Sequence, residues 1–213
     1  MARVLSVNVG RPRPISERLT SAIVKTPVEG RVRVEGVNLA GDDQADRSVH
    51  GGPDKAVYAY AREDTAFWED ITGADLPHGA FGENLTTEGL EVTGAIIGER
   101  WRIGTTVLEV CQPRFPCAKL GVRFGDLRMV RAFTKASRPG AYLRIVTEGE
   151  LGAGDEITVL SRPDHGVTLQ LTFDALLNDH ALAAAALRAP ELPGWLRGEL
   201  APYAASRAAA TAS

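Results

Sequence analysis

This sequence has too few cysteines for a disulfide framework and no apolar run long enough to cross a membrane. It contains only two cysteines among 213 residues, which indicates a reducing compartment. Polar side chains interrupt residues 1–7 too early for the apolar segment of a signal peptide. We therefore expect a cytoplasmic protein without a membrane partner.

An excess of basic residues is also missing. The formal net charge of -3 argues against a broad nucleic-acid-binding surface, although it leaves room for a local basic site. Apolar residues make up 44% and charged residues 24% of the chain, as in ordinary globular proteins. The length suits one large domain, or one domain with a small appendage.

Short strands dominate the first three quarters of the chain. Residues 31–37 alternate between apolar and polar side chains, as a half-buried strand does. Many short strands separated by glycine and proline predict a closed or nearly closed β-barrel, so the fold class is mainly β with a few helices. Further strands are expected at residues 4–9, 22–24, 56–60, 100–111 (two strands meeting at Gly104), 141–146 and 156–160.

Helical patterns are few before residue 164 and dominate after it. Apolar residues at helical spacing predict helices at residues 63–71 and 124–135. Alanine and leucine then prevail, and residues 172–189 and 195–203 should be helical. We expect a β domain over residues 1–163, a small helical domain over 164–205 and a fraying tail over 206–213.

The segment QPRFPCAKL, residues 112–120, follows a predicted strand and contains the more interesting cysteine. Pro113 and Pro116 make a continuing helix or paired strand unfavourable, so we expect a stiff loop. Arg114 and Lys119 would favour the thiolate of Cys117, which attacks electrophiles or binds soft metals. Alternatively, Cys117 is one more small buried residue.

A second polar segment, residues 42–55, contains Arg47, His50 and Lys55 around two glycines. Three donors in a glycine-containing loop suit a phosphate or another anion, and a solvated surface loop is the alternative. Asp46 and His50 could bind a hard metal, but two ligands do not make a site.

Two shorter clusters and several isolated residues complete the candidates. Glu83 and Asn84 could hydrogen-bond a heterocycle or simply stabilise a turn. Arg138 and Tyr142 could contact a ligand, or Tyr142 could be a core residue. We interpret four other residues as packing residues: Trp68, Trp101, Trp195 and Cys111.

Several of these motifs, in this order, resemble the MOSC family, which is named for the molybdenum cofactor sulfurase C-terminal domain. The chain is most similar to its bacterial YiiM-like subgroup, which includes the 6-N-hydroxylaminopurine resistance protein and has three helices after the barrel. The resemblance covers nearly the whole chain and weakens in the alanine-rich tail. It is carried by residues 36–46 (GVNLAGDDQAD), 49–57 (VHGGPDKAV), 81–85 (FGENL), 112–120, 138–140 (RPG), 148–149 (EG) and 154–155 (GD).

The resemblance implies a MOSC-type β-barrel that binds the molybdenum cofactor, molybdopterin. It implies that Cys117 is the protein ligand of molybdenum, and the subgroup is associated with reduction of N-hydroxylated base analogues to amines. Glu83 and Asn84 would orient the pterin or the substrate, and Arg138 and Tyr142 would contact the substrate. The other implied cofactor contacts are Arg47, His50, Lys55, Arg114 and Lys119.

The sequence differs from close relatives at two positions, and the resemblance also implies which partners the protein has. Ala61 and Asp64 stand where close relatives are expected to have a proline and a histidine, so specificity could differ. Two cysteines cannot hold an iron–sulfur cluster, so the electrons should come from a separate reductase. The other expected partner is a small N-hydroxylated substrate. Binding of pyridoxal phosphate is not expected, and the sequence leaves a homodimer open.

Three other functions stay open at this point. The chain could carry or transfer the molybdenum cofactor without turnover. Cys117 could instead form a persulfide and transfer sulfur. The basic loop alone would also suit a module that binds nucleic acid or a small anion, which is the weakest of the alternatives.

Overall fold

Eight strands form the largest sheet of this computed structural model, which describes residues 1–45 and 51–211. Its β7 and β8 are parallel, whereas the other paired neighbours are antiparallel. In spatial order, the strands are β13 (Ile157–Ser161), β9 (Arg100–Ile103), β10 (Thr106–Pro113), β11 (Ala141–Thr147), β7 (Val57–Ala61), β8 (Leu85–Glu88), β1 (Arg3–Val9) and β4 (Thr26–Val28). Two smaller sheets contain β12 (Gly149–Gly152), β5 (Arg31–Glu35) and β6 (Asn38–Leu39), and β2 (Arg13–Ser16) and β3 (Leu19–Ser21).

The two ends of the large sheet approach each other without forming a closed ladder. The Val4 N–H donates to the Asp155 carbonyl at 2.9 Å, and the Ile157 N–H donates to the Ala2 carbonyl at 2.9 Å. These bonds join the start of β1 to the beginning of β13, while β4 and β13 remain the terminal strands. The structure therefore confirms a sheet-dominated fold with several helices, and the predicted closed barrel is not confirmed.

Strand prediction succeeded where the period-two pattern was clear. In β5, Val32 and Val34 are buried between exposed charged residues, as predicted. The strand predicted at residues 22–24 is wrong, because β3 ends at Ser21. The short strands β8 and β12 were missed, because their pairing partners lie far away in the sequence and turn residues flank them.

The loop predicted at residues 112–120 is shorter than expected. Strand β10 continues to its end at Pro113, where Gln112 pairs with Tyr142 and Pro113 with Ala141. A register shift just before Gln112 lets the strand end on a residue that has no N–H. Helix α2 begins at Ala118, so only residues 114–117 lie outside regular structure.

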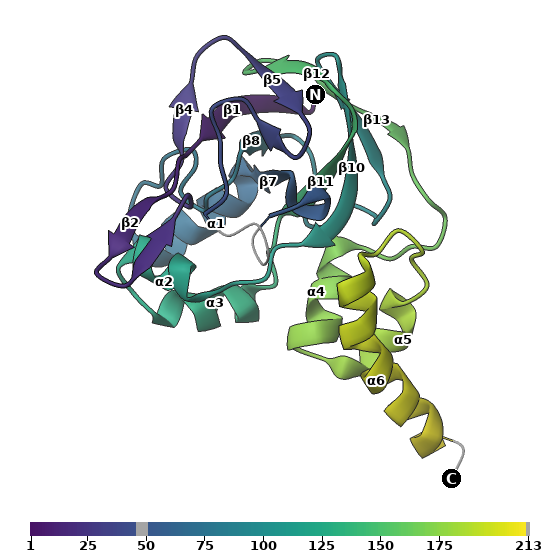
Figure 1. The fold of residues 1–213 in the computed structure, drawn as a ribbon. Helices are drawn as coiled ribbons and strands as arrows, with labels where there is room; N and C mark the ends of the chain where they lie inside the picture. Colours follow the sequence, from purple (N-terminus) through teal and green to yellow (C-terminus); the bar gives the residue numbers. More distant parts are fainter. Residues whose placement is uncertain (46–50, 212–213) are drawn as a thin grey trace.

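Helices α2 and α3 lie side by side near β2, and α4–α6 group together as a helical subdomain at the C-terminal end of the chain (Figure 1). Thr168 caps α4, because its hydroxyl accepts a 3.0 Å bond from the Leu171 N–H. Helix α6 extends to Thr211, through the segment expected to fray. The helices are α1 (Arg62–Thr72), α2 (Ala118–Phe124), α3 (Arg128–Ala136), α4 (Leu169–Leu177), α5 (Ala183–Ala186) and α6 (Gly194–Thr211), with 3-10 turns η1 (Pro53–Lys55) and η2 (His180–Leu182).

One apolar core joins the sheet to the helical subdomain. It contains Val4 and Leu108 from the sheet and Ala183 and Leu196 from the helices. A second, aromatic core lies between β7 and helices α1, α3 and α4. Trp68 and Trp101 are buried as predicted packing residues, and Cys111 is a buried thiol in β10. No helix among residues 1–45 and 51–211 is long and apolar enough to cross a membrane.

Candidate functional site

Two cavities meet at Cys117. The first cavity has a volume of about 100 Å³ and lies among loops at the edge of the large sheet. The second cavity, of about 470 Å³, lies between the sheet and the helical subdomain. Both are lined by Lys55, Phe115, Cys117 and Tyr142, so a group bound at the Cys117 sulfur could be reached from either side.

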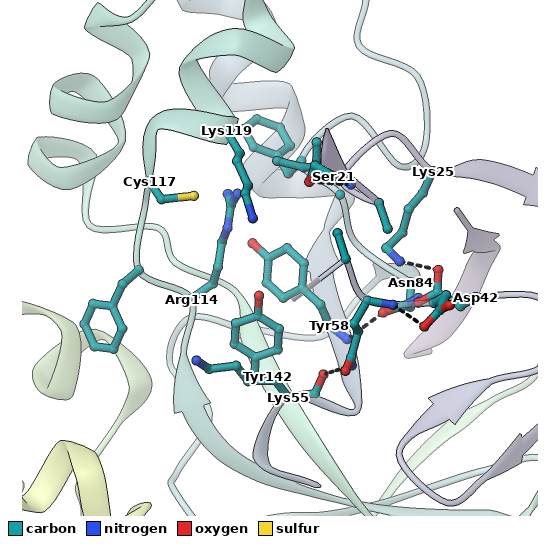
Figure 2. A pocket seen from close by; sticks show the side chains of 18 residues that line it. Ser21, Lys25, Asp42, Lys55, Tyr58, Asn84, Arg114, Cys117, Lys119 and Tyr142 are labelled. Carbon is teal, nitrogen blue, oxygen red and sulfur yellow. Dashed lines mark hydrogen bonds and ion pairs between the residues drawn. The ribbon is translucent and has the colours of Figure 1, made fainter. Parts of the chain in front are cut away.

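Cys117 lies immediately before α2, with an extended backbone. Its side chain is half-buried and does not cap the helix, so the sulfur is left to face the cavities. Figure 2 shows this thiol pointing toward Arg114, with the Lys119 side chain beside it. A cysteine sulfur is a good ligand for a soft metal, so this position is a candidate metal ligand.

Arg114 is a buried cation in the wall of the first cavity. Its side chain packs between two aromatic rings, with the guanidinium carbon 5.6 Å from the Tyr58 ring centre and 5.4 Å from that of Phe133. The residue is only 5% exposed, and its Nη1 has no hydrogen-bond partner among the described residues. A buried charged donor without a partner is costly, so this position favours an anionic ligand.

Tyr58 and Tyr142 line the first cavity beside Arg114, with ring centres 5.1 Å apart. The Tyr58 hydroxyl donates to the Pro139 carbonyl at 2.9 Å. Desolvation raises the pKa of both phenols, against the opposing effect of the Arg114 charge. Both side chains therefore stay protonated at neutral pH and can donate hydrogen bonds.

Lys25, Asp42 and Asn84 form the opposite wall of the first cavity (Figure 2). The Lys25 ammonium donates to Asp42 Oδ1, and Asn84 Nδ2 donates to Asp42 Oδ2 at 2.9 Å. The Gly10 N–H also donates to Asp42 Oδ1, at 2.7 Å. Desolvation lowers the pKa of Lys25, while Asp42 opposes that change. This network fixes the amide of Asn84, whose Oδ1 accepts from the Tyr58 N–H at 3.1 Å.

Lys25 is a site residue that the sequence analysis missed. No local pattern marks it, because its partner Asp42 lies 17 residues away in the sequence. The charged pair becomes visible only once β4 and the loop after β6 are placed in space.

Glu83 does not line either cavity. Its buried carboxylate accepts bonds from the Gly79 N–H at 2.6 Å, the Phe81 N–H at 3.0 Å and the Thr86 hydroxyl at 2.9 Å. Desolvation raises its pKa, although these hydrogen bonds oppose the rise. Glu83 therefore fixes the turn that carries Asn84, and its direct contact with a ligand stays a prediction.

Arg138 also lies outside both cavities. Its Nη1 is 2.5 Å from Asp64 Oδ1, and its guanidinium lies 4.3 Å from the Phe67 ring centre. The other Asp64 oxygen accepts from the Thr93 hydroxyl at 3.0 Å. Asp64, one of the departures noted above, is thus the buried member of a partly buried ion pair at the start of α1, where Ala61 is the residue before the helix.

The remaining predicted cations fall into two groups. Lys119 lies on α2 and Lys55 at the end of η1, and both line the first cavity. Desolvation lowers the pKa of Lys55, against the effect of Asp54. Arg47 and His50 lie outside the described residues.

The second cavity has a different lining, with three prolines and Trp195 of α6. Gln112 Nε2 donates to the Asp54 carbonyl at 2.8 Å, which fixes the orientation of that amide. Arg144 joins the walls: it donates to Asp54 Oδ1, to Glu109 Oε1 at 3.1 Å and to the Glu191 carbonyl at 2.9 Å.

The site has no ready-made cluster of metal ligands. Among the described residues, no group of three histidine, cysteine, aspartate or glutamate side chains could hold a metal ion. A metal bound at Cys117 would therefore have to bring most of its ligands with it.

Comparisons with known proteins agree with these observations. Residues 46–158 match the MOSC domain. The chain is 39% identical over 180 residues to the uncharacterised protein YflK of Bacillus subtilis (strain 168), covering 83% of this chain and 80% of that protein. It is 34% identical over 161 residues to protein YiiM of Escherichia coli (strain K12), covering 74% and 72%.

Two further comparisons bear on fold and chemistry. The crystal structure of YiiM from Geobacillus stearothermophilus superposes with a TM-score of 0.79 at 28% identity, covering 95% of this chain and 99% of that one. A protein of Gibberella moniliformis (strain M3125 / FGSC 7600) named "Reductase" is 35% identical over 166 residues, or 75% of this chain. The matched region is only 29% of that fungal protein.

Proposed function

This chain belongs to the MOSC domain family, and we propose that it binds the molybdenum cofactor through Cys117 and reduces N-hydroxylated compounds to amines. One observation carries the proposal: the half-buried Cys117 lies where a cationic cavity meets a larger, more apolar one. The first cavity suits an anionic cofactor and the second a small substrate. The name of the fungal relative, "Reductase", supports the redox part of the proposal.

The residues of the first cavity, which has a volume of about 100 Å³, fit the phosphate end of a pterin cofactor. Arg114 offers a buried donor that lacks a partner, and Lys119 and Lys55 add positive charge beside it. Asn84 lies on the opposite wall, where both of its amide hydrogens are donated to Asp42 and the Asn8 carbonyl, so only its Oδ1 could accept a further bond from a ligand. The sulfur of Cys117 would be the single protein ligand, which fits the lack of any other ligand cluster among the described residues.

When bound, the cofactor would supply the two-electron chemistry that breaks the N–O bond. That reaction consumes two electrons and two protons and releases an amine and water. Tyr142 lines both cavities, and because desolvation raises its pKa it can donate a hydrogen bond to the oxygen that leaves. The two cysteines of this sequence cannot hold an iron–sulfur cluster, so we expect a reductase outside these 213 residues to supply the electrons.

The test is elemental analysis of wild type and Cys117→Ala, each purified from a host that makes the cofactor. We expect near-stoichiometric molybdenum in the wild type and almost none in Cys117→Ala. Cys111→Ala is the matched control, because this buried cysteine lines neither cavity and its variant should keep the metal.

Other outcomes would replace the proposal. Equal molybdenum in wild type and Cys117→Ala would overturn the ligand assignment. Molybdenum without reduction of any N-hydroxylated substrate, by any reductase supplied, would indicate a cofactor carrier. An added sulfur atom on Cys117 by mass spectrometry, with no molybdenum, would indicate sulfur transfer.

A further inference from the structure

Two segments that pack together concentrate positive charge in a chain that is acidic overall. Residues 11–18 and 118–136 contain eight lysines and arginines but only two acidic residues, whereas the whole chain has 24 basic and 27 acidic residues. The first segment contains β2 and the turn that leads into β3, and the second contains α2 and α3. Helix α2 contacts both β2 and α3, so these elements lie together (Figure 1). We call the exposed side of these four elements the basic face.

Most cations of the basic face lack the carboxylate partners that surface arginines have elsewhere. Outside the face, Arg3 pairs with Glu88 at 2.7 Å, and on the face Arg128 pairs with Asp126 at 2.9 Å. Within residues 1–45 and 51–211, no carboxylate forms an ion pair with the other exposed cations of the face, which are Arg11, Arg13, Arg18, Arg131 and Lys135. Unpaired cations gathered on one side create a positive potential that attracts an acidic partner.

An exposed leucine gives an independent indication of a protein partner. Leu127 lies in the turn between α2 and α3 and is 67% exposed. Arginines around an exposed apolar side chain are typical of protein–protein interfaces. A surface that binds nucleic acid gains little from an exposed leucine, and the chain as a whole is not basic. The basic face therefore suits an acidic protein better than a nucleic acid.

The basic face borders the first cavity but not the second. Cys117 immediately precedes α2, and Lys119 of α2 and Ser21 of β3 line the first cavity. None of the described residues that line the second cavity belongs to β2, β3, α2 or α3. A protein docked on the basic face would therefore lie beside the sulfur that we propose as the metal ligand, and it would leave the second cavity open to a substrate.

We propose that the basic face is the docking surface for an acidic electron-carrier protein that contains a flavin or an iron–sulfur cluster. The inference rests on the proposed function for its need of electrons, and it adds where the donor binds and which charge recognises it. Reduction of one N–O bond takes two electrons and two protons, so two one-electron carriers are oxidised for each amine released, and the protons come from water. Electron-transfer complexes are commonly small and weak, and complementary charge raises their rate of association.

The first test measures binding without turnover, by surface plasmon resonance, with two acidic carriers as probes: a flavodoxin and a plant-type ferredoxin. The double variant Arg131→Glu/Lys135→Glu should weaken binding of the carriers roughly tenfold at low salt, and the difference should shrink at high salt. Leu127→Ala should weaken binding at both salt concentrations. Arg102→Glu/Arg188→Glu is the matched control, because it changes the net charge equally at two exposed positions outside the basic face, on β9 and after α5.

The second test compares two electron donors during turnover of an N-hydroxylated substrate by the molybdenum-loaded protein. With reduced flavodoxin as the donor, kcat/KM for the carrier should fall roughly tenfold in Arg131→Glu/Lys135→Glu. With reduced methyl viologen, a small cationic donor that does not need an acidic docking contact, the rate should stay the same. A loss of rate with both donors would overturn the inference, because it would show that the two residues act on the site itself.

The binding measurement separates this inference from the proposed function. Equal affinity of the two double variants for the carriers, or no binding of either carrier to the wild type, would overturn the docking surface. Tighter binding of duplex DNA or of phosphatidylserine vesicles, lost in Arg131→Glu/Lys135→Glu, would also overturn it and assign the basic face to phosphate groups. Carrier binding that depends on the basic face, in a protein that reduces no N-hydroxylated substrate even with reduced methyl viologen, would retain the surface and reject the proposed function.

Discussion

The two cavities share Cys117 but are built in different ways. The wall of the first is fixed by hydrogen bonds and charges, such as those joining Lys25, Asp42 and Asn84. The wall of the second is made mainly by packed rings and prolines, and one of its rings comes from α6. Under the proposed function, the sheet and its loops would recognise the charge of a ligand, whereas the helical subdomain would help to recognise its shape.

This difference predicts different consequences of mutation. A buried network of charges fails when one member is removed, because the remaining groups lose their partners. In a wall of packed aromatic rings, replacing one ring by a smaller side chain leaves the backbone in place. Such a change should alter which ligands fit before it lowers the stability of the protein. Removing a member of the charged network should therefore lower stability, whereas removing the other cations of the first cavity should lower cofactor retention. Variants of the second cavity should change the choice of substrate.

The largest effect is expected for Asp42→Ala. This change leaves the buried Lys25 ammonium unpaired and also removes acceptors for Gly10 and Asn84. The free energy of unfolding should fall by about 3–5 kcal/mol, measured by urea denaturation. Glu35→Gln is the control: its ion pair with Arg33 is exposed, so the loss should be about 0–1 kcal/mol. Similar losses in both variants would contradict the network that we describe.

Arg114→Met should separate stability from cofactor binding. The substitution removes a buried, partly unpaired cation, so the cofactor-free protein should keep its stability within about 1 kcal/mol. Cofactor retention should fall about 10- to 100-fold, the loss expected for a charge-assisted hydrogen bond. Molybdenum content per folded protein measures the effect. Arg128→Met is the control, because Arg128 is exposed and lines neither cavity. Full cofactor retention in Arg114→Met would contradict an anion at this position.

A smaller effect is expected for Lys119→Gln. Lys119 is half-buried at the rim of the first cavity, so solvent and salt screen its charge. Cofactor retention should fall only about two- to fivefold at low salt, and less at high salt. Lys135→Gln on α3, an exposed position away from both cavities, should have no effect. A salt-independent loss would instead place Lys119 in a buried contact.

Much of the first cavity could be predicted from short motifs. Cys117, Arg114 and Lys119 lie within one segment, and Asn84 and Lys55 belong to two other recognisable ones. Local sequence is sufficient there because the chain brings these groups together over few residues. The structure also places the predicted Glu83 and Arg138 in buried networks outside the cavities, which the chemistry of their side chains could not reveal.

The second cavity could not be predicted in this way. Trp195 and Gln112 are 83 positions apart, and each fits its own local pattern, a helix start and a strand end. Their common function as cavity walls depends on how α6 packs against the sheet. The short strands β8 and β12 were missed for the same reason, because nonlocal pairing stabilises them.

Arg144 does not line the second cavity, but it joins two segments that lie around it. One guanidinium holds Asp54 from the η1 turn and the Glu191 carbonyl, which lies just before the helix that carries Trp195. The guanidinium is flat and its N–H donors point in fixed directions. The Arg144 side chain therefore constrains the distance between the η1 turn and the segment before α6. Under the proposed function, a molecule too bulky for the cavity could enter only after one of these Arg144 hydrogen bonds breaks.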